Sequence, residues 1–223
     1  YITISDLFRR HSDLKVADPI KSICDLHKVF VACTGIDETL DHFYGWGQLL
    51  LADFDDVDKN MVDAKLLFAN LSDIHELDDV SYLTDYQKAM IKKFFSNFSD
   101  DHNTELKKRF LQLWSHFYDI YIGFNQKLAE QQLAYEGALY RKVVNDEDID
   151  FHYKKYLFIG FNMMQIVEQT LCDRLLKQGK ALFYWDYDKY YMEGQNEAGH
   201  YIRQYLKHYP NELATYPQKD IYD

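Results

Sequence analysis

The chain has 223 residues, 47% of them hydrophobic, and a formal net charge of −11. This apolar content is enough for one large domain or two small ones. The acidic net charge argues against a protein that binds a nucleic-acid backbone over most of its surface, although it leaves room for a local basic groove. The three cysteines are scattered, no apolar run approaches the roughly 20 residues of a membrane span, and the N-terminus lacks a signal-peptide pattern, so we expect a cytoplasmic protein. Because the first residues already look structured, with Ser5 as a helix cap, we expect a piece of a longer polypeptide.

The first part of the chain predicts a helix, a strand and a second helix. Asp18 as N-cap, Pro19 at the first helical position and Gly35 as a stop predict a helix over residues 18–35. The bare apolar run 49–52 predicts a buried parallel strand that ends in four carboxylates, Asp53, Asp55, Asp56 and Asp58. Apolar residues at 62, 66, 67 and 71 predict the helix that follows.

Long helical patterns occupy residues 84–145. The clearest one alternates three- and four-residue steps through Leu106, Phe110, Leu113, Phe117, Tyr121, Phe124 and Leu128.

The pattern then changes to strand, helix and strand. The run 156–161 predicts a buried strand, Asn162 is expected to cap a helix that ends at Gly179, and 181–185 predicts a third strand that ends in Asp186 and Asp188. A strand, helix and strand within about 30 residues indicate a βαβ crossover with parallel strands. The expected fold class is therefore α/β, a small parallel sheet interrupted by a large, mostly α-helical insertion.

The acids at 53–58 and at 186–188 are the candidate site residues, because open α/β sheets bind ligands at the carboxyl ends of their strands. In nucleotide hydrolases this layout holds Mg²⁺ opposite a phosphate-binding loop, but the sequence has no G-x-x-x-x-G-K-[ST] motif. A calcium loop fails because Met61 stands in place of the required Gly. The alternative is that these acids only cap helices.

Other motifs favour structural roles. Asp/Glu-x-Lys triplets occur at 13–15, 63–65 and 105–107, but such a triplet is only part of a nuclease signature, which also needs a second acid beside it to bind the metal. Cys24 and His27 are more typical of a helix core than of a zinc site. The aromatic run 183–191 could stack single-stranded bases or line a core. No complete catalytic set and no metal site is predicted.

Taken in order, the motifs resemble the UvrD-like superfamily 1 helicase fold of AddB-type subunits, which are PD-(D/E)XK nuclease family proteins of double-strand break repair. The segment Ala52-Asp-Phe-Asp-Asp-Val57 is similar to the second helicase motif, D-E-F-Q-D-T, with Ala52 in place of the first Asp and Asp53 in place of Glu. The segment 156–162 and a helix with Glu168 are similar to the opening of the second motor domain. Phrases such as His42-Phe-Tyr-Gly-Trp-Gly47 add to the likeness.

The resemblance implies three parts: residues 1–80 from the first P-loop NTPase-like motor domain with a degenerate second motif (Ala52, Asp53, Asp55 and Asp56), 81–150 as a helical insertion, and 151–223 as a βαβ segment that opens the second motor domain. It implies a non-catalytic part of an ATP-dependent exonuclease, with an AddA-like helicase subunit and DNA as partners of the full-length protein. It assigns no cofactor to this chain, whereas Mg²⁺ and ATP would serve the parent protein. Two alternatives remain: an independent Mg²⁺-dependent phosphoryl-transfer enzyme using Asp53, Asp55 and Asp186, and a protein-interaction module.

Overall fold

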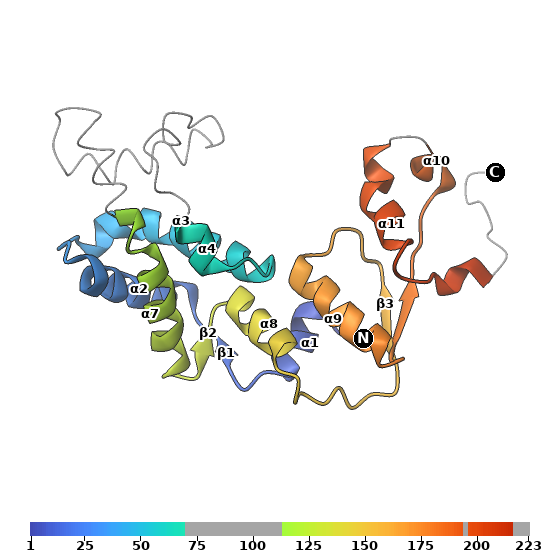
Figure 1. Ribbon diagram of the computed structural model, residues 1–223, viewed down its shortest axis with the longest axis horizontal. Coiled ribbons are helices and arrows are strands. Elements are labelled where there is room, and N and C mark those ends of the chain that lie inside the picture. Colours follow the sequence, from blue (N-terminus) through green and yellow to red (C-terminus); the bar gives the residue numbers. More distant parts are fainter. Residues whose placement is uncertain (70–112, 194–195, 216–223) are drawn as a thin grey trace. The chain divides into compact units, whose positions relative to one another are not determined.

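The computed structural model describes residues 1–69, 113–193 and 196–215 (Figure 1). The chain divides into two compact units, Tyr1–Asp146 and Glu147–Asp223, which are described separately. The sequence analysis expected boundaries at 80/81 and 150/151; the two units divide after Asp146, and residues 80 and 81 lie outside the described residues. Helices dominate both units, and each unit contains one pair of short parallel strands.

Unit 1 begins with helix α1, Ile4–Arg10. Its N-cap is Thr3, whose hydroxyl accepts a hydrogen bond from the backbone N–H of Asp6 (3.0 Å), while the Asp6 carboxylate accepts from the Thr3 N–H. The prediction that Ser5 caps this helix is therefore wrong. The reciprocal bonds of Thr3 and Asp6 form a capping box, which satisfies two backbone donors at once.

Helix α2, Pro19–Thr34, confirms the first predicted helix. The Asp18 side chain accepts hydrogen bonds from the N–H groups of Ile20 (3.0 Å) and Lys21 (3.1 Å). Gly35 ends the helix in the left-handed conformation, with φ of 69°. Only glycine adopts this conformation without steric cost, so the stop was readable from the sequence.

Helix α3, Leu40–Lys59, contradicts the prediction of a strand over residues 49–52. Phe43, Trp46, Leu50, Phe54 and Val57 are buried at steps of three and four residues, which is the period of one helix face. The run Leu49–Leu51 is the point where that stripe meets two further leucines, and a short apolar run does not distinguish a strand from a buried helix. The acids at 53–58 are thus helical residues.

Helices α2, α3 and α7 build the core of unit 1 (Figure 1). Helix α7, Phe117–Ala129, confirms the described part of the predicted helix over 106–128, and α4, Ala64–Ala69, confirms the helix expected after residue 62. Residues 106–112 and Leu71 lie outside the described residues. The core is rich in aromatic rings, and several of these side chains are fully buried: Phe30, Phe43, Phe54 and Phe124.

A parallel strand pair closes unit 1. Strand β1, Lys15–Val16, pairs with β2, Leu133–Ala134, and helix α8, Glu136–Asn145, follows β2 directly. Contacts of α8 with α3 and α1 bring the two ends of the unit together. Neither two-residue strand was predicted, because pairs this short leave no period in the sequence.

Unit 2 contains the predicted βαβ crossover. Strand β3, Tyr156–Ile159, pairs in parallel with β4, Ala181–Tyr184, and helix α9, Ile166–Lys177, connects them. The helix begins after Gln165, not after Asn162 as predicted, because Gln165 and Glu168 form the capping box. The unit continues with short helical elements: α10, Lys189–Met192; η2, Glu197–Gly199; α11, His200–Tyr205; and η3, Glu212–Thr215.

Candidate functional site

The acid-rich segment that carried the functional prediction lies on the second half of helix α3. Ala52, Asp53 and Asp56 are exposed, Asp55 is half-buried and Asp58 is buried. They do not stand at the end of a strand, as the second motif of a helicase would require. Because a helix turns 100° per residue, the segment divides into separate groups of side chains with different surroundings.

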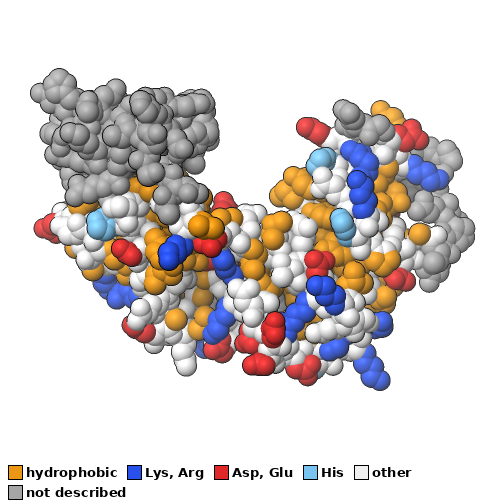
Figure 2. Space-filling view, viewed as in Figure 1, with side chains coloured by type: hydrophobic (Ala, Val, Ile, Leu, Met, Phe, Trp, Pro, Cys, Tyr) orange, Lys and Arg blue, Asp and Glu red, His pale blue; other side chains and the backbone are white. Residues whose placement is uncertain are grey.

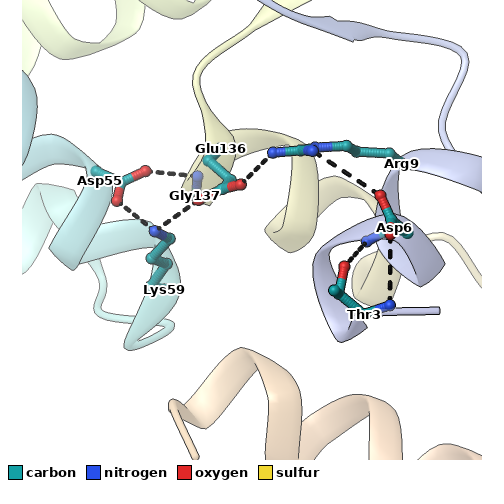
Figure 3. A network of polar contacts seen from close by, with 7 residues as sticks. All are labelled: Thr3, Asp6, Arg9, Asp55, Lys59, Glu136 and Gly137. Carbon is teal, nitrogen blue, oxygen red and sulfur yellow. Dashed lines mark hydrogen bonds and ion pairs between the residues drawn. The ribbon is translucent and has the colours of Figure 1, made fainter.

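Asp55 belongs to a polar network that joins α3, α8 and α1 (Figure 3). Its Oδ1 accepts a hydrogen bond from the backbone N–H of Gly137 (2.6 Å), and its Oδ2 receives the ammonium of Lys59 (2.7 Å). Lys59 also donates to Glu136 (3.2 Å), which accepts from Arg9 of α1 (2.7 Å). The carboxylate of Asp55 therefore anchors the N-terminus of α8.

The network is charge-balanced, and the pKa values follow. Burial alone would raise the pKa of the Glu136 carboxyl, but the nearby Tyr140 hydroxyl and the hydrogen bonds from Lys59 and Arg9 outweigh burial and lower it. At Lys59, the carboxylates of Asp55 and Glu136 outweigh burial and raise the pKa of the ammonium group. Both shifts favour the ionised forms of Glu136 and Lys59, which hold each other in place.

The approach of α8 to α3 requires glycine at position 137. A Cβ on Gly137 would lie 2.5 Å from the backbone oxygen of Asp55 and 3.0 Å from its Oδ1. Backbone cannot move aside as the end of a side chain can, so a larger residue would separate the helices. Gly137 therefore permits the close contact of α8 with Asp55, a role that the sequence alone did not predict.

Asp58 is the centre of a second cluster and is 1% exposed. It accepts hydrogen bonds from Tyr121 (2.5 Å) and Tyr135, and from the guanidinium of Arg141 (3.2 Å). Burial and the contact with Asp58 both raise the pKa of the Tyr121 hydroxyl, which keeps it protonated as a donor. A buried carboxylate with three donors is a structural centre that connects α3, α7 and α8.

Asp53 and Asp56 face an apolar recess of about 420 Å³ in unit 1. Its walls come from α3, α4, the link between them, the first residue of α7 and the segment just before it, and they include Leu50, Phe68 and Trp114. In the described part of the chain, neither carboxylate has an ion pair or a side-chain hydrogen bond.

The acids after β4 lie in unit 2. Asp188 caps α10 by accepting a hydrogen bond from the N–H of Tyr190 (2.8 Å), which is the capping alternative of the sequence analysis. Asp186 is exposed between β4 and α10. Of the aromatic run, Phe183 and Trp185 are buried and stack at 5.8 Å, whereas Tyr190 and Tyr191 are exposed.

The weaker motifs have local partners. His27 donates from Nε2 to the carbonyl of Glu38 (2.6 Å), Asp13 pairs with Lys142 (2.7 Å), and Asp63 accepts from the N–H of Leu66 (3.0 Å). The triplet at 105–107 lies outside the described residues. Among the residues that the structure describes, no three His, Cys, Asp or Glu side chains are grouped to hold a metal ion.

Comparisons of the chain with protein-family models, with curated proteins and with solved structures gave no match. In the described ranges, no helix combines the length and the apolar character needed to cross a membrane. Figure 2 shows basic and acidic side chains interspersed on the visible face.

Proposed function

We propose that this chain is a non-catalytic, helicase-like part of an ATP-dependent exonuclease that acts in double-strand break repair and recombination. In this proposal the full-length parent is a cytoplasmic PD-(D/E)XK nuclease family hydrolase that uses Mg²⁺ and ATP. It meets DNA together with an AddA-like helicase subunit. The chain itself contributes structure and contacts, not a reaction centre.

The parallel arrangement of β3, α9 and β4 is the observation that carries this proposal. It combines a strand over 156–159, a helix with Glu168 in its first turn and a second parallel strand. These are the elements that the resemblance to the opening of a second motor domain implies. Parallel strands joined by a helix are also the building unit of nucleotide-binding α/β folds.

The comparison with the second helicase motif receives no support from the structure, because Ala52–Val57 is helical. The roles of Asp55 and Asp58 within the fold instead favour a structural use of these carboxylates. Asp55 accepts from Gly137 and Lys59, and Asp58 accepts from three donors. The phosphoryl-transfer alternative needs Asp55 as a free metal ligand, so this engagement disfavours it.

The test uses the full-length parent protein and its helicase partner. Linear duplex DNA, labelled at one end, is incubated with both proteins, with and without Mg-ATP. The proposal expects degradation that depends on ATP. Absence of ATP-dependent degradation by a folded, complete complex contradicts it.

A further inference from the structure

The recess beside Asp53 and Asp56 combines apolar walls with an acidic rim. Three aromatic rings lie close together at its wall: Trp114 is 5.0 Å from Phe117 and 6.0 Å from Phe68, measured between ring centroids. Phe68 and Phe117 are 9% and 6% exposed, whereas Val62 and Leu67 at the edge are 36% and 40% exposed. The recess therefore offers apolar surface to anything that enters it.

The two carboxylates lie on the same face of α3, because they are three residues apart. The basic residue nearest in sequence, Lys59, is used elsewhere, because it pairs with Asp55 and Glu136. Two like charges on neighbouring turns repel each other, so this arrangement costs stability unless a cation lies between them.

The electrostatics of Asp53 agree with this geometry. Asp53 is exposed, but neighbouring protein atoms displace part of its solvent, and this partial desolvation and the negative charge of Asp56 raise the pKa of its carboxyl to about 6. The carboxyl is still mostly ionised at neutral pH, and a bound cation would lower its pKa.

We propose that this recess binds the side chain of a lysine or arginine, flanked by apolar residues, from a partner polypeptide. The ammonium or guanidinium lies between Asp53 and Asp56, and the apolar flanks cover Val62 and Leu67. The aromatic wall contributes a favourable surface for a cation and its methylene stem. A polypeptide suits the site better than a small amine because the partly exposed edge extends the apolar surface beyond the acids. This site does not depend on the helicase-like proposal.

The test is a titration of the full 223-residue chain, ¹⁵N-labelled, with blocked peptides followed by NMR. Acetyl-Leu-Lys-Leu-amide carries the cation, acetyl-Leu-Gln-Leu-amide is its neutral control, and n-butylammonium represents a free amine. The variant Asp53→Asn/Asp56→Asn removes both charges. Asp37→Asn, on an exposed residue before α3, is the matched control. Circular dichroism verifies that each variant is folded.

The proposal expects the lysine peptide to shift the Trp114 indole signal and the amide signals of α3 and α4, and to lower the pKa of Asp53. Binding should weaken about tenfold in the double variant and remain unchanged in Asp37→Asn. The proposal is wrong if both peptides bind equally, if the double variant has no effect on binding, or if no peptide shifts any signal. Saturation by n-butylammonium at the same concentration assigns it to a small amine instead. Shifts that depend on protein concentration without ligand assign it to a second copy of the chain.

Discussion

Replacement of Gly137 by alanine probes the contact between α3 and α8 most sharply. The new Cβ would lie 2.5 Å from the backbone oxygen of Asp55, so the helices must separate. Overpacking of this kind costs about 1–3 kcal/mol. The hydrogen bond from the Gly137 N–H to the Asp55 carboxylate, 2.6 Å long, would stretch or break, at a cost of about 1.5–3 kcal/mol for a charged acceptor. Alanine returns up to about 1 kcal/mol of helix propensity.

The expected net loss in the free energy of unfolding is therefore about 1.5–5 kcal/mol, measured by urea denaturation at neutral pH. Gly123→Ala is the matched control, because its Cβ would meet only a methyl group of Val29, at 3.1 Å. A side-chain methyl can shift by a few tenths of an ångström, so this variant should stay within about 1 kcal/mol of the wild type. If Gly137→Ala is as stable as Gly123→Ala, the inference that α8 lies too close to Asp55 for a larger residue at position 137 is wrong.

Three further results are expected. The Glu136 carboxyl has a pKa below its usual value of 4.5, so its ionised form stabilises the fold above that pH. The difference in unfolding free energy between wild type and Glu136→Gln should therefore be largest near neutral pH and vanish as the pH falls through the folded-state pKa. Denaturation measured over a series of acidic pH values tests this. Asp58→Asn should lower the free energy of unfolding in urea by about 2–4 kcal/mol, because two tyrosine hydroxyls and a guanidinium lose a charged acceptor. Asp37→Asn, at an exposed position, should lower it by less than about 0.5 kcal/mol. Equal losses would contradict the structural role of Asp58. With a net charge of −11, the chain should bind labelled duplex DNA weakly and with strong salt dependence in fluorescence anisotropy, and nanomolar binding at physiological salt would contradict this expectation.

Local signals in the sequence were sufficient for part of the fold. Asp18, Pro19 and Gly35 are a cap, a helix-starting residue and a left-handed stop, and each acts through its own backbone neighbourhood. The crossover over 156–184 was predictable because two short apolar runs enclose a helical period.

The error at residues 49–52 has a physical reason. Three successive leucines satisfy the pattern of a buried strand, and the helical period becomes visible only when Phe43 and Trp46 are included in the window. Once the segment is helical, its acids point in different directions and enter different surroundings.

The two polar clusters could not be predicted from the sequence. Asp58 meets Tyr121 and Tyr135 across separations of 63 and 77 residues, and Asp55 meets Gly137 across 82. No local period links such positions, since only packing of α3 against α7 and α8 brings them together. Asp55 and Asp58 were expected to be site residues, or caps, at the end of a strand, whereas in the fold they hold helices together.

Asp55 and Asp58 support the fold, and we expect that this chain does not turn over nucleotide. The most direct test is isothermal titration calorimetry of the chain with Mg-ATP, combined with phosphate release from the same samples. We expect no phosphate release and an affinity no tighter than the millimolar range, because exposed carboxylates on α3 repel phosphate. Micromolar affinity accompanied by phosphate release that Asp53→Asn abolishes would contradict it.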